Sequence, residues 1–304
     1  MAVPQMDRRT VRIPALLAAP MTTNSTAGTP APEARFAFGR NWRAFLSVLD
    51  EGRIEQAQIS LKEMLEVDNL RGKSFLDAGS GSGLFSLAAV RLGAARVHSF
   101  DYDFGSVACT EEVKRQYAHE FICWTIEQGS VLDERYISRL GFFDVVYSWG
   151  VLHHTGSLEE AMEIVSRAVA PRGKLLIALY DDRGWASRAW VPVKRLYVSS
   201  RVGAAVVVGV FLPIFVVKGL LSDLASGRNP LARYRDYRRL RGMSIVHDWL
   251  DWLGGFPFAV ASPQRVIEFY AQRGFRLAKL KRGHGRDRNN EFVFVKDAEH
   301  SVLS

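Results

Sequence analysis

A glycine-rich loop preceded by a carboxylate is the part of the sequence best suited to chemistry. Residues 75–86, FLDAGSGSGLFS, run from an apolar strand end through three alternating glycines into a helical pattern. Glycine lets the backbone turn tightly and lets a ligand approach the main chain, and the helix that follows offers free N–H groups at its start. The pattern predicts a ligand-binding loop, with a plain strand–turn–helix connection as the alternative.

The spacing of the glycines distinguishes this loop from a dinucleotide-binding loop. That fingerprint is Gly-x-Gly-x-x-Gly, but the sixth position counted from Gly79 is Leu84. Asp77, just before the loop, would repel a pyrophosphate and would suit a ligand with a cationic end, such as S-adenosylmethionine. The stretch resembles the cofactor loop of class I S-adenosylmethionine-dependent methyltransferases. The cofactor-binding residues expected here are Asp77, Gly79, Ser80, Gly81 and Gly83.

A second carboxylate follows the next apolar segment. Residues 96–101 form a predicted strand that ends at Asp101, about 20 residues past the loop. An acidic residue at this place can bind both ribose hydroxyls of a nucleoside. We expect Tyr102, which comes next, to lie against the adenine. An ordinary helix cap or turn is the alternative role for Asp101.

Two later segments add to the resemblance. Residues 128–133, QGSVLD, stand where the family carries a Gly-Asp-Ala type segment that contacts adenine. Ser130 replaces that aspartate, so the resemblance supports the backbone around Val131 better than the side chain of Ser130. Residues 149–154, WGVLHH, follow the fourth predicted strand. In the family this segment lies beside the methionine part of the cofactor and faces the substrate, which makes Trp149 a further expected cofactor residue.

Strand and helix patterns alternate through the middle of the chain. The predicted strands are 73–77, 96–101, 121–126, 142–148 and 174–180, and the predicted helices are 84–92, 104–119 and 157–170. This alternation favours a parallel sheet with helices on both faces. A helix at 262–273 and strands at 275–280 and 291–296 follow. Together with the resemblance they predict an α/β fold: a doubly wound, seven-stranded, mostly parallel Rossmann-like sheet with a helical cap insertion.

We expect five regions along the chain. They are a disordered tail (1–34), N-terminal helices (35–72), the S-adenosylmethionine-binding core (73–180), a helical cap insertion (181–261) and a C-terminal helix with antiparallel strands that complete the core (262–298). The tail is rich in Pro, Ala, Thr and Ser. The cap departs from the family pattern, and a structureless loop of that length inside a compact domain is implausible.

The cap contains an apolar run with an open role. Residues 202–217 carry no charge and lie between Arg201 and Lys218. The run is shorter than the roughly 20 residues that a spanning helix needs, and Pro213 is expected to interrupt it. A stretch of arginines and tyrosines follows at 228–241. Three placements stay open: packing on the core, peripheral contact with a membrane surface, and true spanning.

Methyl transfer to a hydroxyl or amine needs a nearby proton acceptor as well as alignment of donor and acceptor. The candidate catalytic residues are His153, His154, His247 and Asp248. A histidine near its ordinary pKa suits this task. Hydrogen bonding that merely holds a loop is the alternative role, and the neighbours His247 and Asp248 would not face each other on a helix.

The sequence therefore predicts an S-adenosylmethionine-dependent methyltransferase acting on a small, hydrophobic or lipid-like acceptor, with oxygen as the favoured target. It is distantly similar to quinone-biosynthesis O-methyltransferases. An RNA methyltransferase, favoured by residues 228–241, and a non-enzymatic binding protein are the alternatives. Nucleic acid is less favoured because no separate RNA-binding module is visible.

Charge and cysteine usage bear on the partner and the compartment. The net charge of +8 favours an anionic partner or surface. The two cysteines, Cys109 and Cys123, lack metal-ligand spacing, so no metal is expected. We expect a cytoplasmic protein, with peripheral contact at the inner membrane face as the alternative.

Overall fold

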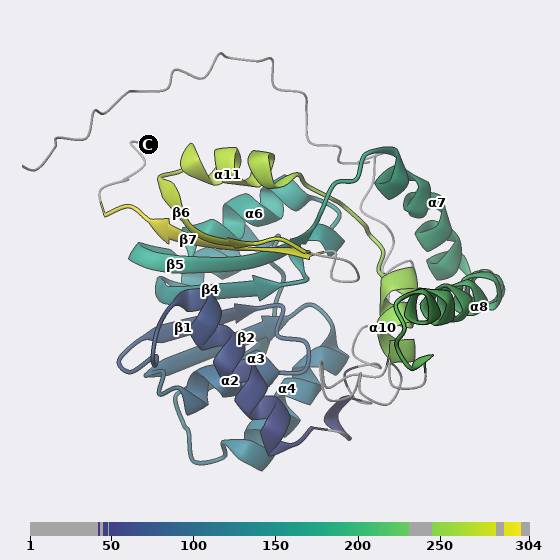
Figure 1. Cartoon of the computed structure of the whole chain (residues 1–304). Coiled ribbons are helices and arrows are strands. Elements are labelled where there is room, and N and C mark those ends of the chain that lie inside the picture. The colour runs from purple at the N-terminus through teal and green to yellow at the C-terminus, as the bar shows by residue number, and fades with distance from the viewer. Residues whose placement is uncertain (1–41, 43–44, 48, 231–244, 284–288, 299–304) are drawn as a thin grey trace, which may run out of the picture.

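A seven-stranded sheet forms the centre of the protein (Figure 1). The computed structural model describes residues 42, 45–47, 49–230, 245–283 and 289–298. The sheet has the strand order β3-β2-β1-β4-β5-β7-β6. Its strands are β1 (Ser74–Ala78), β2 (Arg96–Asp101), β3 (Trp124–Gln128), β4 (Phe143–Trp149), β5 (Val169–Tyr180), β6 (Phe275–Lys281) and β7 (Asn289–Lys296).

The register shows where the sheet changes direction. Strands β1 to β5 pair in parallel, whereas β7 inserts antiparallel between β5 and β6. The carboxyl ends of β1, β2, β3 and β4 consequently meet along one edge, where open α/β sheets bind their ligands. The predicted seven-stranded, mostly parallel sheet is confirmed.

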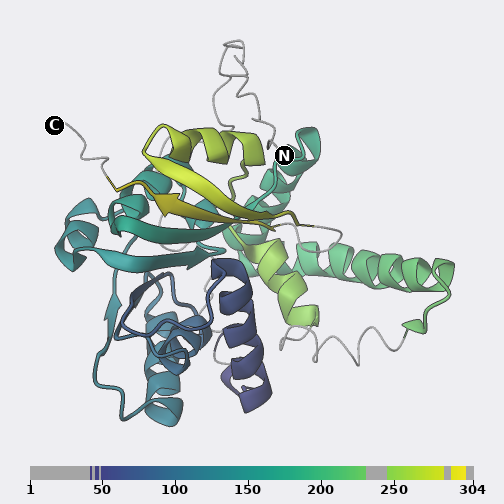
Figure 2. The same ribbon diagram turned by 60° about the vertical axis from the view of Figure 1, so that its left-hand side comes forward.

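Helices cover both faces of the sheet (Figures 1 and 2). They are α2 (Glu51–Leu65), α3 (Leu84–Arg91), α4 (Phe104–Tyr117), α5 (Glu134–Leu140), α6 (Leu158–Arg167) and α11 (Pro263–Ala271), with a 3-10 turn η2 (Leu152–His154). One apolar core joins α2, α3 and α4 to the sheet, and a second joins α5, α6 and α11 to its other face. The two cores make the sheet rigid, so its carboxyl edge can hold side chains in fixed positions.

Three local predictions were wrong in detail. The apolar pattern at 36–67, with Trp42 on its apolar face, predicts a helix over this whole stretch. That helix does not run through, because Asp50 is extended and caps α2 by accepting from Arg53 N at 2.9 Å. The third strand begins at Trp124, later than expected, since the buried indole anchors it beside β2. Helix α5 was not predicted, because its seven residues are too few for a clear apolar period. The expected tail, 1–34, lies outside the described residues.

The cap consists of three helices between β5 and α11: α7 (Trp185–Ser199), α8 (Arg201–Ala225) and α10 (Ile245–Gly254). They lie together beside one end of the sheet, and α8 extends away from the core (Figures 1 and 2). The chain leaves β5 at Tyr180 and returns at Ala261, whose N–H donates to the Tyr180 carbonyl at 3.0 Å. Both ends of the cap are thereby tied to the carboxyl end of β5.

The expected interruption at Pro213 was wrong. Helix α8 is continuous over 25 residues, with Pro213 inside it. An internal proline costs about 3 kcal/mol, because it removes one hydrogen bond and crowds the carbonyl four residues earlier. Here that carbonyl belongs to Gly209. Phe211 and Phe215 pack against Trp190 on either side of the proline, and this packing stabilises the continuous helix.

Helix α8 is also long and apolar enough to cross a membrane by length and composition. It is the one such helix among the described residues. Only 6% of its most apolar 18-residue window is buried. This exposure separates α8 from the core helix of a globular domain, which would be mostly buried.

Candidate functional site

Asp77 is a buried carboxylate at the carboxyl end of β1. It is 1% exposed and accepts from Ser86 Oγ at 2.5 Å. Ser86 Oγ lies 2.7 Å from Ser99 Oγ, which accepts from the indole of Trp124. Burial raises the pKa of Asp77 to about 7. A cationic group brought next to this carboxylate would stabilise its ionised form, so the site suits an ammonium.

The glycine loop after Asp77 leaves no room for side chains. Gly79 has a φ of +88°, and a Cβ placed on it would lie 2.7 Å from Val151 Cγ1. Gly81 has a φ of +55°, and a Cβ there would lie 3.0 Å from the indole of Trp42. The segment after β4 and the indole of Trp42 thus border the loop from two sides. Sequence reasoning placed Trp42 only on an apolar helix face and gave Val151 no role.

Asp101 lies at the end of β2 and binds the same loop. Its Oδ2 accepts from Gly81 N at 3.0 Å, and its Oδ1 accepts from Asp103 N at 2.9 Å. Burial is the main cause that raises the pKa of Asp101 to about 6. A carboxylate can accept more hydrogen bonds than these two, so the residue can still accept from ribose hydroxyls. The neighbouring Tyr102 is 52% exposed, which leaves its ring accessible to a base.

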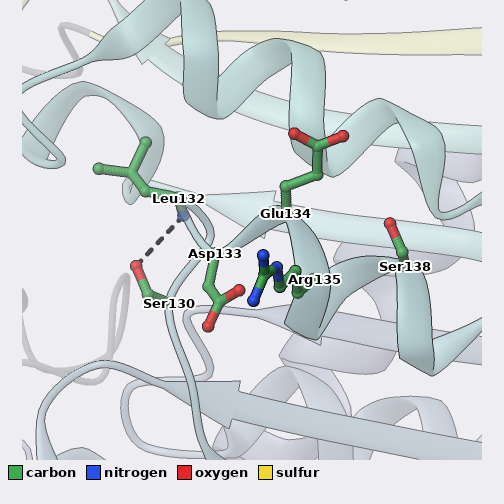
Figure 3. A pocket seen from close by; sticks show the side chains of 6 residues that line it. All are labelled: Ser130, Leu132, Asp133, Glu134, Arg135 and Ser138. Atoms are coloured by element: carbon green, nitrogen blue, oxygen red, sulfur yellow. Dashed lines mark hydrogen bonds between the residues drawn. The ribbon is translucent and has the colours of Figure 1, made fainter.

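The segment after β3 borders an open depression of about 890 Å³ (Figure 3). Ser130 Oγ accepts from Leu132 N at 3.2 Å and closes a tight turn, so the hydroxyl serves the local backbone. The side chain of Val131 is buried in the core, which leaves its backbone as the part that can meet a ligand. Asp133 accepts from Tyr136 N at 2.9 Å and caps α5.

Trp149 ends β4 at the same edge of the sheet. Its indole Nε1 donates to Glu291 Oε1 of β7 at 3.3 Å, so the ring lies over β5 toward β7. The structure therefore brings the ends of β1, β2, β3 and β4 together, and Asp101 of β2 binds the loop that begins after Asp77 of β1. The predicted cofactor residues gather at one edge of the sheet.

His153 and His154 belong to a group of rings that we name the histidine–aromatic cluster: His153, His154, Tyr180 and Phe258. The ring centroid of His153 lies 4.3 Å from that of His154 and 4.1 Å from that of Tyr180. Tyr180 in turn lies 5.4 Å from Phe258. The cluster joins the carboxyl ends of β4 and β5 to the chain between α10 and α11.

Both histidines are neutral at neutral pH. Burial lowers the pKa of His154 to about 3, and it lowers the pKa of His153 well below its usual range, with His154 and Lys194 adding to the effect. His154 Nδ1 donates to the Pro257 carbonyl at 2.7 Å, which assigns the lone pair to Nε2. Within the described part of the chain, neither nitrogen of His153 has a hydrogen-bond partner.

Lys194 of α7 is a functional candidate that sequence reasoning missed. Its side chain is fully buried, and its Nζ donates to the Trp252 carbonyl of α10. The same nitrogen lies 4.8 Å from the Phe258 ring and 6.0 Å from the Tyr180 ring. A lysine inside an amphipathic helix is usually solvated, so its type and position carried no signal. The lysine links two cap helices to the cluster.

His247 and Asp248 are not placed by the structure in the same detail. Both lie in α10, whose backbone is described, but their side chains lie outside what the structure describes. Most of the arginine and tyrosine stretch, residues 231–241, also lies outside the described residues. Among the described residues, no group of three or more His, Cys, Asp and Glu side chains could hold a metal ion.

A methyltransferase-domain family model matches residues 49–200. The chain therefore belongs to the family of class I S-adenosylmethionine-dependent methyltransferases. This match spans α2 through the end of α7 and includes every strand end described above. The matched domain is that of S-adenosylmethionine-dependent methyltransferases, and S-adenosylmethionine is the cofactor that membership of this family implies.

Two curated relatives and one solved structure illustrate the range of similarity. A ribosomal protein L11 methyltransferase of Anoxybacillus flavithermus is 38% identical over 72 residues, 23% of this chain and 22% of the relative. A tRNA U34 carboxymethyltransferase of Pseudomonas putida is 28% identical over 127 residues, 42% of this chain and 39% of the relative. The chain thus covers well under half of the length of either relative.

One similar solved structure aligns with most of both chains. It is the magnesium protoporphyrin IX methyltransferase of Synechocystis PCC 6803 with bound SAH. It has a TM-score of 0.50 and 13% identity, and covers 85% of this chain and 94% of that chain. At this identity the similarity concerns the fold alone.

The residues present fit S-adenosylmethionine. Asp77 offers a buried carboxylate for the ammonium group, and Asp101 offers acceptor oxygens for the ribose. Gly79 and Gly81 have positive φ values and carry no side chain, so the cofactor can approach the main chain of the loop closely. Tyr102 and the backbone at Val131 border the region left for the base.

Proposed function

We propose that the protein methylates a small, hydrophobic acceptor, with an oxygen atom as the favoured target. The observation that carries this proposal is the histidine–aromatic cluster, which lies where the cap meets the carboxyl ends of β4 and β5. Its rings offer apolar faces, and its histidines offer neutral nitrogen lone pairs. Val151, two residues before His153, contacts the glycine loop, so cofactor loop and cluster share one short segment.

The chemistry supplied by bound S-adenosylmethionine is a methyl group whose carbon bonds to the acceptor oxygen while its bond to sulfur breaks and sulfur keeps the electron pair. Asp77 and Asp101 would hold the two ends of the donor and fix its direction. Orientation of this kind can account for about 7–11 kcal/mol of the barrier. The packed rings of the cluster would exclude water from the acceptor side.

The acceptor proton needs a destination. His154 is oriented by the Pro257 carbonyl, and its Nε2 is the nitrogen that can accept a proton. Its low pKa makes it a weak base, suited to an acceptor whose own pKa has been lowered. The buried ammonium of Lys194, which lowers the pKa of both histidines, would also lower the pKa of an acceptor hydroxyl such as a phenol and would stabilise the phenolate left when His154 accepts the proton.

The relatives suggest other acceptor classes. Proteins that share the cofactor-binding core include a ribosomal protein methyltransferase and a tRNA carboxymethyltransferase. These similarities cover 22% and 39% of the relatives' own lengths. They support binding of the methyl donor, S-adenosylmethionine, more than they support any particular methyl acceptor. Protein and RNA acceptors are therefore competing outcomes of the test.

The test is methyl transfer from radiolabelled cofactor to fractions of a cell extract. Equal amounts of organic-solvent extract, bulk tRNA and soluble protein would be incubated separately with the purified full-length protein. The proposal expects label in the organic-soluble fraction and a product about 14 Da heavier than its precursor, the mass of the added methylene. Label confined to tRNA or to protein would overturn the small-acceptor proposal. An Asp101→Ala variant supplies the control for transfer that does not depend on the cofactor site.

A further inference from the structure

Helix α8 exposes a continuous row of aliphatic side chains. We name it the aliphatic stripe: Val202, Val206, Val210, Ile214, Val217, Leu221 and Leu224. Each of these side chains is between 48% and 73% exposed. Their spacing of three or four residues places all of them on one face of the helix. A helix of 25 residues is about 37 Å long, so the stripe runs nearly the whole length of the helix.

The opposite face of α8 is occupied by protein. Phe211 and Phe215 lie 5.0 Å and 6.5 Å from the Trp190 ring of α7, and Phe215 lies 5.9 Å from the Trp252 ring of α10. Val207 and Gly219 are buried on the same side. The aromatic side chains of α8 thus point inward, and the large apolar side chains on the outward face are all aliphatic. Such a large exposed apolar surface marks an interaction site.

The charges on α8 favour an anionic partner. The exposed surface of the helix carries Arg201 at its start and Lys218 in its second half. Its one acidic residue, Asp223, is 3% exposed and lies 3.5 Å from Arg228. The aliphatic stripe is therefore flanked by cations and by no exposed carboxylate of its own helix. Anionic lipid headgroups attract cations placed this way, each with about 1 kcal/mol near the surface.

We propose that α8 lies in the plane of a lipid bilayer, with the aliphatic stripe inserted at the boundary between headgroups and acyl chains. Lipid tails need only apolar, shape-tolerant contact, which aliphatic side chains provide. A protein partner would instead favour aromatic anchors with hydrogen-bonding groups around them, and the stripe contains neither.

The packing of the inner face favours the in-plane orientation over spanning. If α8 crossed the bilayer, its partners α7 and α10 would be drawn into the hydrocarbon with it. Helix α7 carries exposed Arg188 and Arg195, and charged groups are costly at that depth. With α8 in the interface, one face contacts lipid, the other contacts protein, and the arginines of α7 remain in water.

Membrane contact would also bear on the acceptor. Helices α7 and α10, which hold α8, also carry Lys194 and the Trp252 carbonyl that border the histidine–aromatic cluster. A membrane-bound α8 therefore keeps the cluster close to the bilayer, where a lipid-soluble acceptor is concentrated. This step rests on the proposed function, whereas the membrane contact itself does not.

The experiment compares two matched triple variants of the full chain. The first is Val206→Gln/Val210→Gln/Ile214→Gln, which changes three stripe side chains that are each about half exposed. The second is Ile59→Gln/Ile122→Gln/Phe142→Gln, which changes three exposed apolar side chains of the catalytic domain. Calorimetry with S-adenosylmethionine checks that both variants keep their folded core, and it tests the cofactor site separately from the membrane.

Binding is measured by co-sedimentation with vesicles of phosphatidylcholine alone and of phosphatidylcholine with phosphatidylserine, at low and high salt. The wild-type protein and the second variant should bind the anionic vesicles, more weakly at high salt. The stripe variant should lose at least about tenfold in affinity while its cofactor affinity stays unchanged. Wild-type protein that stays in the supernatant with both vesicle types would overturn the proposal.

Two other outcomes would also overturn it. A wild-type dimer in light scattering, converted to a monomer by the stripe variant, would identify a second copy of the chain as the occupant if vesicle binding is absent. Retention of the vesicle-bound protein after alkaline carbonate washing would show that α8 spans the bilayer. Release by carbonate, with the loss of binding in the stripe variant, supports the in-plane contact.

Discussion

The backbone N–H of Gly81 donates to Asp101 Oδ2 at 3.0 Å, so the carboxylate at the end of β2 holds the middle of the loop that follows β1. The second oxygen of the same carboxylate accepts from Asp103 N. Asp101 therefore fixes the middle of the loop by two hydrogen bonds, which limits the conformational freedom that the loop would otherwise have.

Replacing Asp101 should weaken cofactor binding through two effects. Asp101→Ala removes an acceptor for the ribose hydroxyls and releases the Gly81 N–H from its partner. Loss of a charged hydrogen-bond acceptor costs roughly 1.5–3 kcal/mol, so affinity should fall about tenfold to a hundredfold by calorimetry. Asp50→Ala is the matched control, because Asp50 caps α2 by a similar bond to Arg53 N. The control should keep its affinity, and unchanged affinity in Asp101→Ala would remove that residue from the site.

Cofactor affinity should depend on pH through the buried carboxylates. Burial raises the pKa of Asp77 to about 7 and that of Asp101 to about 6, so both are largely protonated at pH 5.5 and largely ionised at pH 8. A cationic donor group binds the ionised form of Asp77. The dissociation constant should be at least about tenfold larger at pH 5.5 than at pH 7.5. Asp77→Asn should bind weakly and lose most of this pH dependence.

The same shift predicts the opposite trend for stability without the cofactor. The pKa of Asp77 is about 7 in the folded protein and 3.8 as the ordinary value, so folding favours the protonated form. Its contribution to the free energy of unfolding is complete below about pH 4 and is lost as the pH rises through 7. Asp77→Asn should therefore raise the melting temperature at pH 8 more than at pH 4. Equal changes at the two values would contradict the buried-carboxylate interpretation.

A side chain at Gly79 should disrupt the loop. In Gly79→Ala the new Cβ would lie 2.7 Å from Val151 Cγ1 in a backbone with a φ of +88°. Crowding and strain together should abolish measurable cofactor binding and lower the melting temperature. Gly72→Ala is the control, since Gly72 has a φ of +73° with no atom within 4 Å of the added Cβ. It should lose about 1 kcal/mol of stability from strain alone and keep its cofactor affinity.

The double variant Gly79→Ala/Val151→Ala tests whether Gly79 and Val151 are energetically coupled. Removing both Cγ atoms of Val151 relieves the nearest contacts of the new methyl group. The double variant should therefore regain part of the lost stability. Independent, additive effects of the two substitutions would show that the contact is not what Gly79 avoids.

The sheet and the cofactor edge could be predicted because local patterns carry them. Continuous apolar runs mark the parallel strands, and the glycine loop follows the first of them, so chain order alone places Asp77 and Asp101 at one edge. The bond between Asp101 and the Gly81 N–H was not predictable, because it depends on how two strand ends sit in register. The same holds for Val151 against Gly79.

The cap could be predicted only as a helical insertion. The proline at position 213 suggested a break in the helix. Tertiary packing of Phe211 and Phe215 on Trp190 outweighs the low helix propensity of this proline. Lys194 is an analogous case, because only the fold shows that a lysine of α7 is buried between aromatic rings. Sequence periodicity shows which side of a helix is apolar. When a helix such as α8 is apolar on more than one side, periodicity does not show which side packs against the rest of the protein. In α8 the aromatic side is covered and the aliphatic side is exposed.

The histidine–aromatic cluster leads to the final prediction, which separates turnover from cofactor binding. His154→Ala removes the nitrogen that is oriented by the Pro257 carbonyl, so kcat with the true acceptor should fall by about a hundredfold or more while cofactor affinity stays unchanged. Because the pKa of His154 is about 3, kcat should show no histidine titration between pH 5 and 8. His119→Ala, at an exposed histidine of the catalytic domain, is the control and should behave as wild type. If His153→Ala, His154→Ala and His247→Ala all keep the wild-type kcat, no histidine acts as the base, and catalysis depends on the positioning of donor and acceptor.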